Sequence, residues 1–252
     1  MRILLSNDDG IYAPGLRAMY KTLSDAGHHV IVVAPASEQS GVSCSLHMRE
    51  PLRVQVLTDG DFIGRIVSGT PVDCMKMALT TLMPELPDLV VVGLNAGSNM
   101  GTDVFYSGTI GAASEAALQG LPVITFSRPA PELEPPLPCA RHAARMVGAI
   151  DWSAIPVGRV LNVNYPRRLM SEVRGVRFCR MSTTCWTEKY IEREDPAGRP
   201  YWWISEYQAR PAGGDDTDIA MLREGYVTIT PLRIDRTDYD LLTRMQRQFP
   251  LD

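Results

Sequence analysis

The sequence predicts an α/β protein with a Rossmann-like core, in which helices cover both faces of a mostly parallel sheet. Three observations support this fold class. Short runs rich in Val, Ile and Leu recur along the chain, and amphipathic helical patterns separate them. These runs are apolar throughout rather than alternating, as expected for strands buried on both faces. The first strand, helix and strand fall within about 33 residues, the length of one βαβ unit.

The first half of the chain supplies most of the expected sheet. Buried strands are predicted at 2–6, 29–34, 89–94 and 122–127, and helices at 14–26, 74–83 and 108–119. Gly27 and Gly120 follow two of these helices and mark their ends. Runs at 52–57 and 62–68 flank the turn Thr58-Asp59-Gly60-Asp61, which predicts a β-hairpin.

The second half of the chain changes character and favours strands. The elements expected there are a proline-rich loop at 129–138, a helix at 139–150, strands at 159–164, 176–181, 189–193, 201–207 and 226–230, and a helix at 238–248.

Two of these strands form an aromatic hairpin around the turn Asp195-Pro196-Ala197-Gly198. Its strands carry Tyr190, Tyr201, Trp202 and Trp203. If these side chains are exposed, the hairpin is an interaction surface. The alternative is that the hairpin packs on the core of its own chain, and the sequence leaves both possibilities open.

Composition excludes several functional classes. The chain has 252 residues and a mass of 27.8 kDa, and its 45% apolar and 21% charged residues are ordinary for a globular protein. A net charge of −4 and a pI near 5.6 argue against binding of a nucleic-acid duplex or of an anionic membrane. No apolar run approaches the ~18–20 residues that span a bilayer, and MRILLSNDDG is unlike a signal peptide. We therefore expect a cytoplasmic protein.

The cysteines argue against a disulfide framework or a zinc site. There are five of them, an odd number, at wide spacings and with no C-x-x-C pair. We expect buried or inert thiols, with Cys44 notable because it lies near a polar loop.

Three polar loops follow three of the predicted parallel strands. They are 7–10, 35–41 and 95–103, and each is rich in hydroxyl, amide or carboxylate oxygens. Ligands of open parallel sheets bind beyond the carboxyl ends of the strands. The three loops are therefore expected to converge on one site.

Asp8 and Asp9 are the first chemical clue in these loops. Two adjacent carboxylates repel each other and need a compensating cation. Oxygen ligands of this kind suit Mg²⁺, Mn²⁺ or Ca²⁺ rather than a metal that prefers thiolates. The alternative is that one aspartate only caps the helix after Gly10. The position after a buried strand favours a functional role.

The segment Tyr106-Ser107-Gly108-Thr109 is the second clue. Ser107 is a suitable N-cap, and Gly108 and Gly111 let backbone N–H groups approach a ligand closely. A helix N-terminus of this kind binds phosphate through its dipole and its free amides. The alternative is an ordinary serine cap with tight helix packing.

Several other chemistries are excluded by missing motifs. The sequence has no G-x-x-x-x-G-K-[ST], no G-x-G-x-x-G after a strand, no G-x-S-x-G and no H-E-x-x-H. His47, downstream of the second polar loop, is open to either a structural or a substrate-binding role.

Taken together, the motifs resemble the SurE family of metal-dependent phosphatases, the 5′/3′-nucleotidases known as survival protein E. The segments that carry the resemblance are SNDDG, VVAP followed by SG, GTPVDC, NAGSNMGTDVFYSGTIGAASEA and TDIAMLREGYVTITPL. They extend from Met1 to about Asp235. The departures are small: the loop before Ser40 lacks a basic residue, and His47 stands where many members have Thr. These departures concern substrate preference.

The resemblance implies a set of site residues. One divalent metal ion per subunit, Mg²⁺ or Mn²⁺, would be held by Asp8, Asp9, Ser40 and Asn95. Phosphate would be bound by Asn99, Ser107, Gly108 and Thr109.

The resemblance also implies an architecture. The chain is then a single α/β domain over 1–252, with a protruding β-hairpin arm at 183–207 and a C-terminal extension at 226–252. The arm and the extension would serve oligomerisation, giving a homodimer or homotetramer.

The implied activity is that of an acid-phosphatase-like phosphoric monoester hydrolase. It would act on nucleoside 5′-monophosphates, and also on 3′-monophosphates and short polyphosphate, by attack of metal-activated water with Asp8 or Asp9 as the proton acceptor. A covalent aspartyl intermediate on Asp8 is less compatible, because aspartate phosphatases use an Asp-x-Asp spacing. The alternative function is a non-catalytic nucleotide or phosphate sensor with a structural metal.

Overall fold

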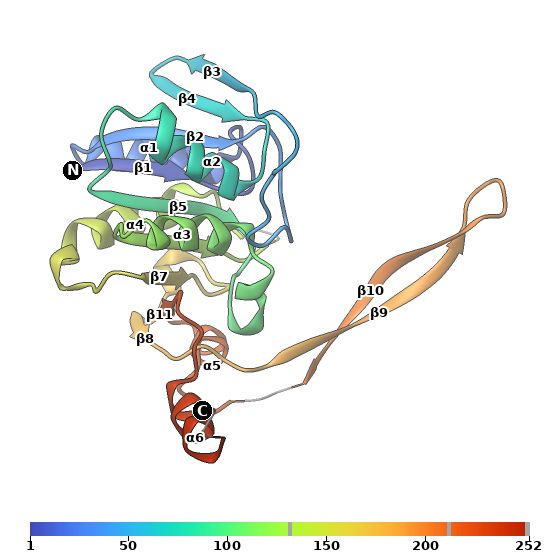
Figure 1. The fold of residues 1–252 in the computed structure, drawn as a ribbon. Helices are drawn as coiled ribbons and strands as arrows, with labels where there is room; N and C mark the ends of the chain where they lie inside the picture. The colour runs from blue at the N-terminus through green and yellow to red at the C-terminus, as the bar shows by residue number, and fades with distance from the viewer. Residues whose placement is uncertain (131–132, 211–212, 250–252) are drawn as a thin grey trace.

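A mostly parallel sheet runs through the body of the protein (Figure 1). The structure, a computed structural model, describes residues 1–130, 133–210 and 213–249. Among these residues the main sheet has nine strands, in the order β3-β4-β2-β1-β5-β6-β7-β11-β8. Their bounds are β1 (Arg2–Ser6), β2 (His29–Pro35), β3 (Val54–Asp59), β4 (Phe62–Val67), β5 (Leu89–Ala96), β6 (Val123–Arg128), β7 (Arg159–Asn164), β8 (Val176–Phe178) and β11 (Val227–Arg233).

The pairing of the strands confirms the predicted fold class. The six neighbours β4, β2, β1, β5, β6 and β7 are all parallel. The edge strand β3 is antiparallel to β4, as the predicted hairpin requires, and β11 is antiparallel to β7. The carboxyl ends of β1, β2 and β5 therefore lie along one edge of the sheet.

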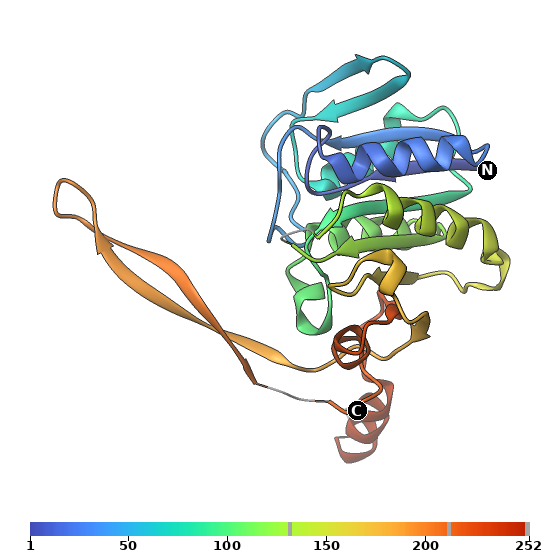
Figure 2. The same ribbon diagram turned by 180° about the vertical axis from the view of Figure 1, so that it is seen from behind.

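Helices cover both faces of this sheet. The helices α2 (Pro71–Met77) and α3 (Gly108–Leu118) lie in front of it in Figure 1, and α1 (Pro14–Asp25) and α4 (Leu137–Ala149) lie in front in Figure 2. Alternate residues of β1 serve the two layers: Ile3 and Leu5 pack with α1 and α4, and Leu4 packs with α2 and α3. The apolar runs are thus strands buried on both sides.

The second helix starts earlier than the pattern at 74–83 predicts. Thr70 caps it by accepting a hydrogen bond from Asp73 N, while the Asp73 carboxylate accepts from Thr70 N, and Pro71 occupies the first turn. Beyond Met77 the chain continues as a π-helix, η1 (Ala78–Leu82). The capping residues, rather than the apolar run, determine where the helix begins.

Other boundaries differ from the predictions by a few residues. The strand predicted at 176–181 ends at Phe178, and β5 extends two residues into the predicted polar loop. Short helices that the pattern did not indicate are η2 (Gly101–Phe105), η3 (Trp152–Ala154), η4 (Met170–Glu172) and α5 (Asp218–Arg223). Part of the proline-rich loop, 131–132, lies outside the described residues.

The strands β9 (Cys185–Glu194) and β10 (Pro200–Arg210) form a two-stranded antiparallel arm that projects far from the body (Figures 1 and 2). Tyr190, Tyr201, Trp202 and Trp203 are all exposed, with Trp203 at 66%. The possibility that the hairpin packs on its own core is therefore wrong for these side chains. The arm starts at Cys185 and ends at Arg210, two to three residues later at each end than the predicted range 183–207.

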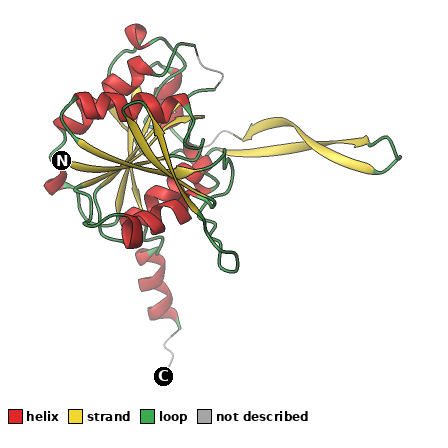
Figure 3. Cartoon of the chain, turned by 90° about the horizontal axis from the view of Figure 1, so that it is seen from above, coloured by secondary structure: helices red, strands yellow, loops and turns green. Residues whose placement is uncertain are grey.

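The C-terminal segment has two different parts. Its first strand, β11, lies inside the main sheet between β7 and β8. The helix α6 (Tyr239–Gln248) leads away from the body (Figure 3) and exposes Leu241, Leu242 and Met245. Residues 250–252 of the predicted extension lie outside the described part of the chain. No helix in the described part is both long and apolar enough to cross a membrane.

Candidate functional site

The polar loops after β1, β2 and β5 converge on one cavity, as their order in the sheet predicts. The cavity has a volume of about 660 Å³. Its wall includes Asp8, Ser40, Asn95, Asn99 and Ser107 from the predicted set. Asp9, Gly108 and Thr109 adjoin these residues in the chain but do not form part of the wall.

Asp8 is a buried carboxylate at the end of β1, with only 5% of its surface exposed. The Asn7 side-chain amide donates to Gly10 O at 3.0 Å and shapes the loop. Asp8 Oδ1 accepts a hydrogen bond from the Thr109 hydroxyl, and Asp8 O accepts from Gln39 N at 2.7 Å. Burial raises the pKa of Asp8, and the hydrogen bonds from Thr109 oppose this shift.

Asp9 connects two loops of the site. Its Oδ2 accepts a hydrogen bond from Ala96 N at 3.0 Å, at the end of β5. Next to it, the Asn95 side-chain amide donates to Gly97 O at 2.7 Å. The carbonyl oxygen of the same side chain can then accept from, or coordinate, another group. On the third loop, the Ser40 hydroxyl donates to Glu38 Oε1 at 2.7 Å.

The chemistry of these donors fits a divalent cation. In the described residues no Lys, Arg or His forms an ion pair with Asp8, so its buried charge lacks a cationic partner from the chain. Carboxylate, amide and hydroxyl oxygens are the ligands that Mg²⁺ and Mn²⁺ prefer. The described chain has no group of three or more His, Cys, Asp or Glu that could hold a metal ion by itself, so amide and hydroxyl oxygens would complete the ligand set.

The N-terminus of α3 packs directly against Asp8. Ser107 caps the helix, its Oγ accepting from Ile110 N at 3.2 Å. A Cβ at Gly108 would lie 3.0 Å from the Asp8 Cβ and 3.1 Å from Gln39 O, so a side chain there would require these neighbours to shift by a few tenths of an ångström. The Thr109 hydroxyl, predicted to bind phosphate, instead donates to Asp8. Its position therefore supports the carboxylate rather than forming the cavity wall.

Asn99 is held by a buried network of asparagines. Its N–H donates to Asn164 Oδ1 at 2.8 Å, and its carbonyl oxygen accepts from Asn162 Nδ2 at 2.7 Å and Asn164 Nδ2 at 2.9 Å. The Asn99 side chain donates to Ser127 Oγ at 2.8 Å. The sequence signal for this network was available, because Asn162 and Asn164 alternate with valine and leucine in a strand that is otherwise apolar.

Two carboxylates beyond the predicted set also line the cavity. Asp103 comes from η2, and Glu188 comes from β9 near the root of the arm, where Cys185 also lines the cavity. Ile204 of β10, farther along the arm, is a further lining residue. Burial raises the pKa of Asp103 to about 6, and the charges of Asp218 and Glu188 add to the shift. The sequence placed Asp103 in the right loop but gave no signal that the arm reaches the cavity.

His47 has a structural role. Its ring Nδ1 is 2.6 Å from Asp73 Oδ2, and the backbone N–H of His47 donates to Asp73 Oδ1 at 3.2 Å. The hydrogen bond to Asp73 raises the pKa of His47. The residue is not part of the cavity wall and ties the 43–50 loop to the start of α2.

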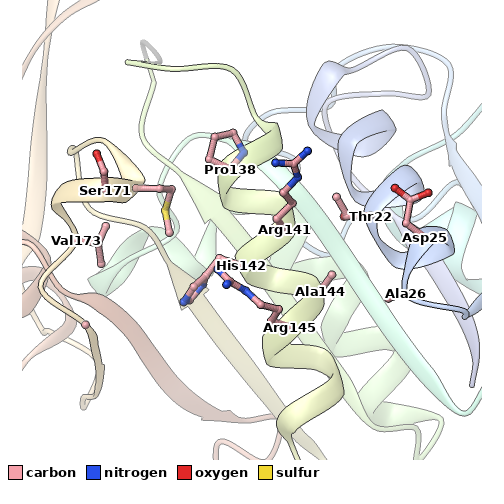
Figure 4. Close-up of a pocket in the computed structure, with 12 residues that line it drawn as sticks. Thr22, Asp25, Ala26, Pro138, Arg141, His142, Ala144, Arg145, Ser171 and Val173 are labelled. Atoms are coloured by element: carbon pink, nitrogen blue, oxygen red, sulfur yellow. The ribbon is translucent and has the colours of Figure 1, made fainter.

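A cavity of about 870 Å³ on the α1 and α4 face of the sheet contains none of the predicted site residues (Figure 4). It runs along α4, where Arg141, His142 and Arg145 project beside α1 and the segment at 170–175. Its one carboxylate among the described residues, Asp25, is exposed, whereas the smaller cavity contains the buried Asp8. We therefore place the functional site in the smaller cavity.

These features define a Rossmann-like α/β protein with its ligand site at the carboxyl ends of the parallel strands. The sequence model of the family described as "Survival protein SurE" matches residues 3–188. The chain belongs to the SurE family, and the resemblance drawn from the motifs is confirmed.

Relatives and a solved structure agree with this assignment over nearly the whole chain. "5′-nucleotidase SurE" of Lawsonia intracellularis is 45% identical over 247 residues, covering 98% of each chain. The protein of the same name from Desulfovibrio desulfuricans is 48% identical over 255 residues, again covering 98% of each. The crystal structure of the SurE protein from Aquifex aeolicus superposes with a TM-score of 0.82 at 34% identity, covering 98% of this chain and 99% of that one.

Proposed function

We propose that this chain is a phosphomonoesterase that hydrolyses nucleoside 5′-monophosphates to nucleoside and phosphate, with one divalent cation per subunit. The names of its relatives support the reaction class. The observation that carries the proposal is Asp8: a buried carboxylate without a cationic partner in the described chain, placed between oxygen donors and the N-terminus of α3. Nucleoside 3′-monophosphates and short polyphosphate are further candidate substrates.

The proposed ligands of the cation are Asp8, Asp9, Ser40 and Asn95. When bound, Mg²⁺ or Mn²⁺ would supply Lewis-acid polarisation of the phosphoryl group and acidify water. The chain contributes the geometry: the Asp9–Ala96 hydrogen bond fixes the β1 loop against β5, and the Gln39–Asp8 hydrogen bond fixes the β2 loop. These contacts hold the oxygen donors of three loops near one another.

The proposed phosphate subsite lies at the start of α3. Gly108 N–H is free of an intrahelical acceptor because it is the first residue of the helix, and the Ser107 hydroxyl can donate to an anion while its oxygen accepts from Ile110 N. Asn99, fixed by its asparagine network, also lines the cavity. Such preorganised donors stabilise charge that develops on the transferring phosphoryl group.

Two carboxylates can move the protons of hydrolysis. Asp8 lines the cavity and is the better placed acceptor for the proton of the attacking water, because Asp9 is engaged with Ala96 N outside the wall. Asp103 lines the same cavity with a pKa of about 6, so it can donate a proton to the leaving oxygen in slightly acidic solution.

A phosphate-release assay tests the proposal. AMP and the other nucleoside 5′-monophosphates should release phosphate with Mg²⁺ or Mn²⁺ and should stop doing so with EDTA. The matching 3′-monophosphates and short polyphosphate, each with both cations, define the range of substrates. AMP binding without release of phosphate from any of these esters would contradict catalysis and indicate the sensor function instead.

A further inference from the structure

A second cavity adjoins the candidate catalytic cavity and shares two residues with it. Gly97 and Ser98, in the loop after β5, contribute to the walls of both. The second cavity has a volume of about 420 Å³, within the ~300–1,000 Å³ typical of small-molecule sites. The two cavities therefore adjoin at Gly97 and Ser98, and together they form the two halves of one candidate binding region.

The two halves of this region differ in chemistry. The catalytic half contains Asp8, Asn95 and Ser107, whereas the second half has a largely apolar floor of Met100, Ile219 and Leu222. Ile219 and Leu222 are buried residues of α5. A polar phosphate fits the first half, and a flat, weakly polar group fits the second.

Two arginines stand at the edge of the apolar half. Arg167 follows β7 and donates from Nη1 to Ala130 O at 3.4 Å, which places it across from the loop after β6. Arg223 stands in the last turn of α5. Both side chains are exposed, and neither has an acidic partner in the described part of the chain. A guanidinium group in such a position can stack on an aromatic ring.

We propose that this apolar cavity binds the base of a nucleotide whose phosphate occupies the catalytic cavity, with Arg167 and Arg223 stacking on or flanking the ring. The sugar would lie at Gly97 and Ser98, the small residues that line both cavities. The inference rests on the proposed phosphomonoesterase function and adds the residues that favour nucleotides over other phosphate esters. It also assigns a role to α5, which the catalytic steps do not use.

The test compares AMP with ribose 5-phosphate, which carries the same phosphate and sugar without the base. In the intact chain, AMP should bind more tightly and have the higher kcat/KM. In the double variant Arg167→Ala/Arg223→Ala, the ratio of kcat/KM for AMP to that for ribose 5-phosphate should fall about five- to thirtyfold, as expected for two lost cation–π contacts. Ala130→Phe, which fills the cavity from its exposed rim, should lower the ratio in the same way.

Arg141→Ala is the matched control, because Arg141 is an exposed arginine on α4 outside both cavities. It should leave the ratio unchanged. Equilibrium binding of AMP and ribose 5-phosphate, measured by calorimetry, separates the two proposals. Preferential AMP binding that the double variant abolishes supports the base site even if no phosphate is released, a result that would overturn only the catalytic proposal. Equal affinities for AMP and ribose 5-phosphate in the intact chain overturn the base site.

Discussion

Asp8 and Asp9 are neighbours in sequence but have different surroundings. Asp8 is buried against α3 and accepts a hydrogen bond from Thr109, whereas Asp9 binds the backbone of Ala96. Each is therefore fixed by a separate element, and together they can present two carboxylates to one cation. Two adjacent aspartates can therefore contribute to one proposed site through different contacts.

We expect Asp8→Asn and Asp9→Asn each to abolish cation-dependent phosphate release, since each change removes a charged ligand from the proposed set. The fold should persist, because an amide can still accept the hydrogen bonds that Thr109 and Ala96 donate. Turnover of AMP at saturating Mn²⁺ and thermal unfolding are the measurements. Near-normal turnover in both variants would refute the assignment.

Ser107→Ala and Thr109→Val should have different effects. Loss of the Ser107 hydroxyl removes a donor to the phosphate, so inhibition by free phosphate should weaken by roughly 1.5–3 kcal/mol, or about ten- to 150-fold. The Thr109 hydroxyl binds Asp8, so its loss should lower kcat while changing phosphate inhibition less.

Inhibition constants and kcat, measured on both variants, separate the two roles. If phosphate inhibition weakened as much in Thr109→Val as in Ser107→Ala, the Thr109 hydroxyl would be a phosphate ligand as the sequence predicts. Ser107→Ala also removes an N-cap, which costs about 1 kcal/mol of stability, so the unfolding free energy is measured alongside.

Asp103 predicts a pH dependence. As a proton donor it must be protonated, so kcat for AMP should fall as the pH rises through about 6. In Asp103→Asn this limb of the profile should vanish and kcat at pH 5 should drop about a hundredfold. p-Nitrophenyl phosphate, whose leaving group needs no proton, should be affected much less.

Glu188→Gln provides the companion variant for Asp103. The charge of Glu188 helps to raise the pKa of Asp103, so its removal should move the limb to lower pH without removing it. An unchanged AMP profile in Asp103→Asn would exclude the residue as the acid.

At the scale of elements, the site depends on how closely the 43–44 backbone approaches α3. A Cβ at Gly111 would lie 2.2 Å from Ser43 O, a backbone atom that cannot move aside easily. Ser43 is itself fixed there, its N–H donating to Tyr106 O and its hydroxyl to Phe105 O. The loop after β2 is thus fastened to the start of α3, the helix proposed to bind phosphate.

Gly111→Ala should therefore destabilise the protein, by about 1–3 kcal/mol, through overpacking against this loop. Gly148→Ala is the control, because Gly148 lies in α4 with open space around its Cα. There the lower entropy of the unfolded chain should raise stability by about 0.5–1 kcal/mol. Urea unfolding of both variants measures the difference. If Gly111→Ala stabilised the protein, the backbone at 43–44 would be able to move away from the added methyl group at little cost.

The same elements show what the sequence could and could not predict. Apolar strands such as β1 and β5 were predictable because burial on both faces demands uninterrupted Val, Ile and Leu. The loops at their carboxyl ends then followed from topology. The start of α2 at Pro71 was missed because it depends on the Thr70–Asp73 capping box rather than on periodicity.

Tertiary contacts explain the site features that sequence reasoning missed. The Thr109 hydroxyl was predicted to face phosphate, but its rotamer depends on the nearby Asp8 carboxylate, 101 positions away in sequence. The contribution of Glu188 and Ile204 to the cavity depends on the path of the arm. Such long-range placements have no periodic signature.

At the scale of the whole molecule, the exposed arm predicts that the chain associates with another subunit. An isolated two-stranded hairpin is marginal in water, and this one exposes Tyr201, Trp202 and Trp203. We expect an oligomer, at least a dimer, in which the arm packs on a neighbouring subunit. Light scattering at micromolar concentration should give a multiple of 27.8 kDa. A monomer would defeat the prediction.

A shortened arm provides the matched variant. Deletion of residues 191–203, with an Asn-Gly turn joining Tyr190 to its partner Ile204, removes Tyr201, Trp202 and Trp203 and keeps Glu188 and Ile204 at the cavity. The assembly should become smaller. Trp202→Ser/Trp203→Ser should weaken it in the same direction, while an unchanged mass in both variants would show that other surfaces hold the subunits together.

The root of the arm forms part of the cavity wall while its tip lies far outside the body. The two ends are joined by continuous strand pairing, so whatever captures the tip restrains the wall. Association obeys mass action, and the fraction of captured arms falls when the protein is diluted. Turnover per subunit would then depend on the enzyme concentration in the assay. A plot of rate against added protein would be curved rather than linear.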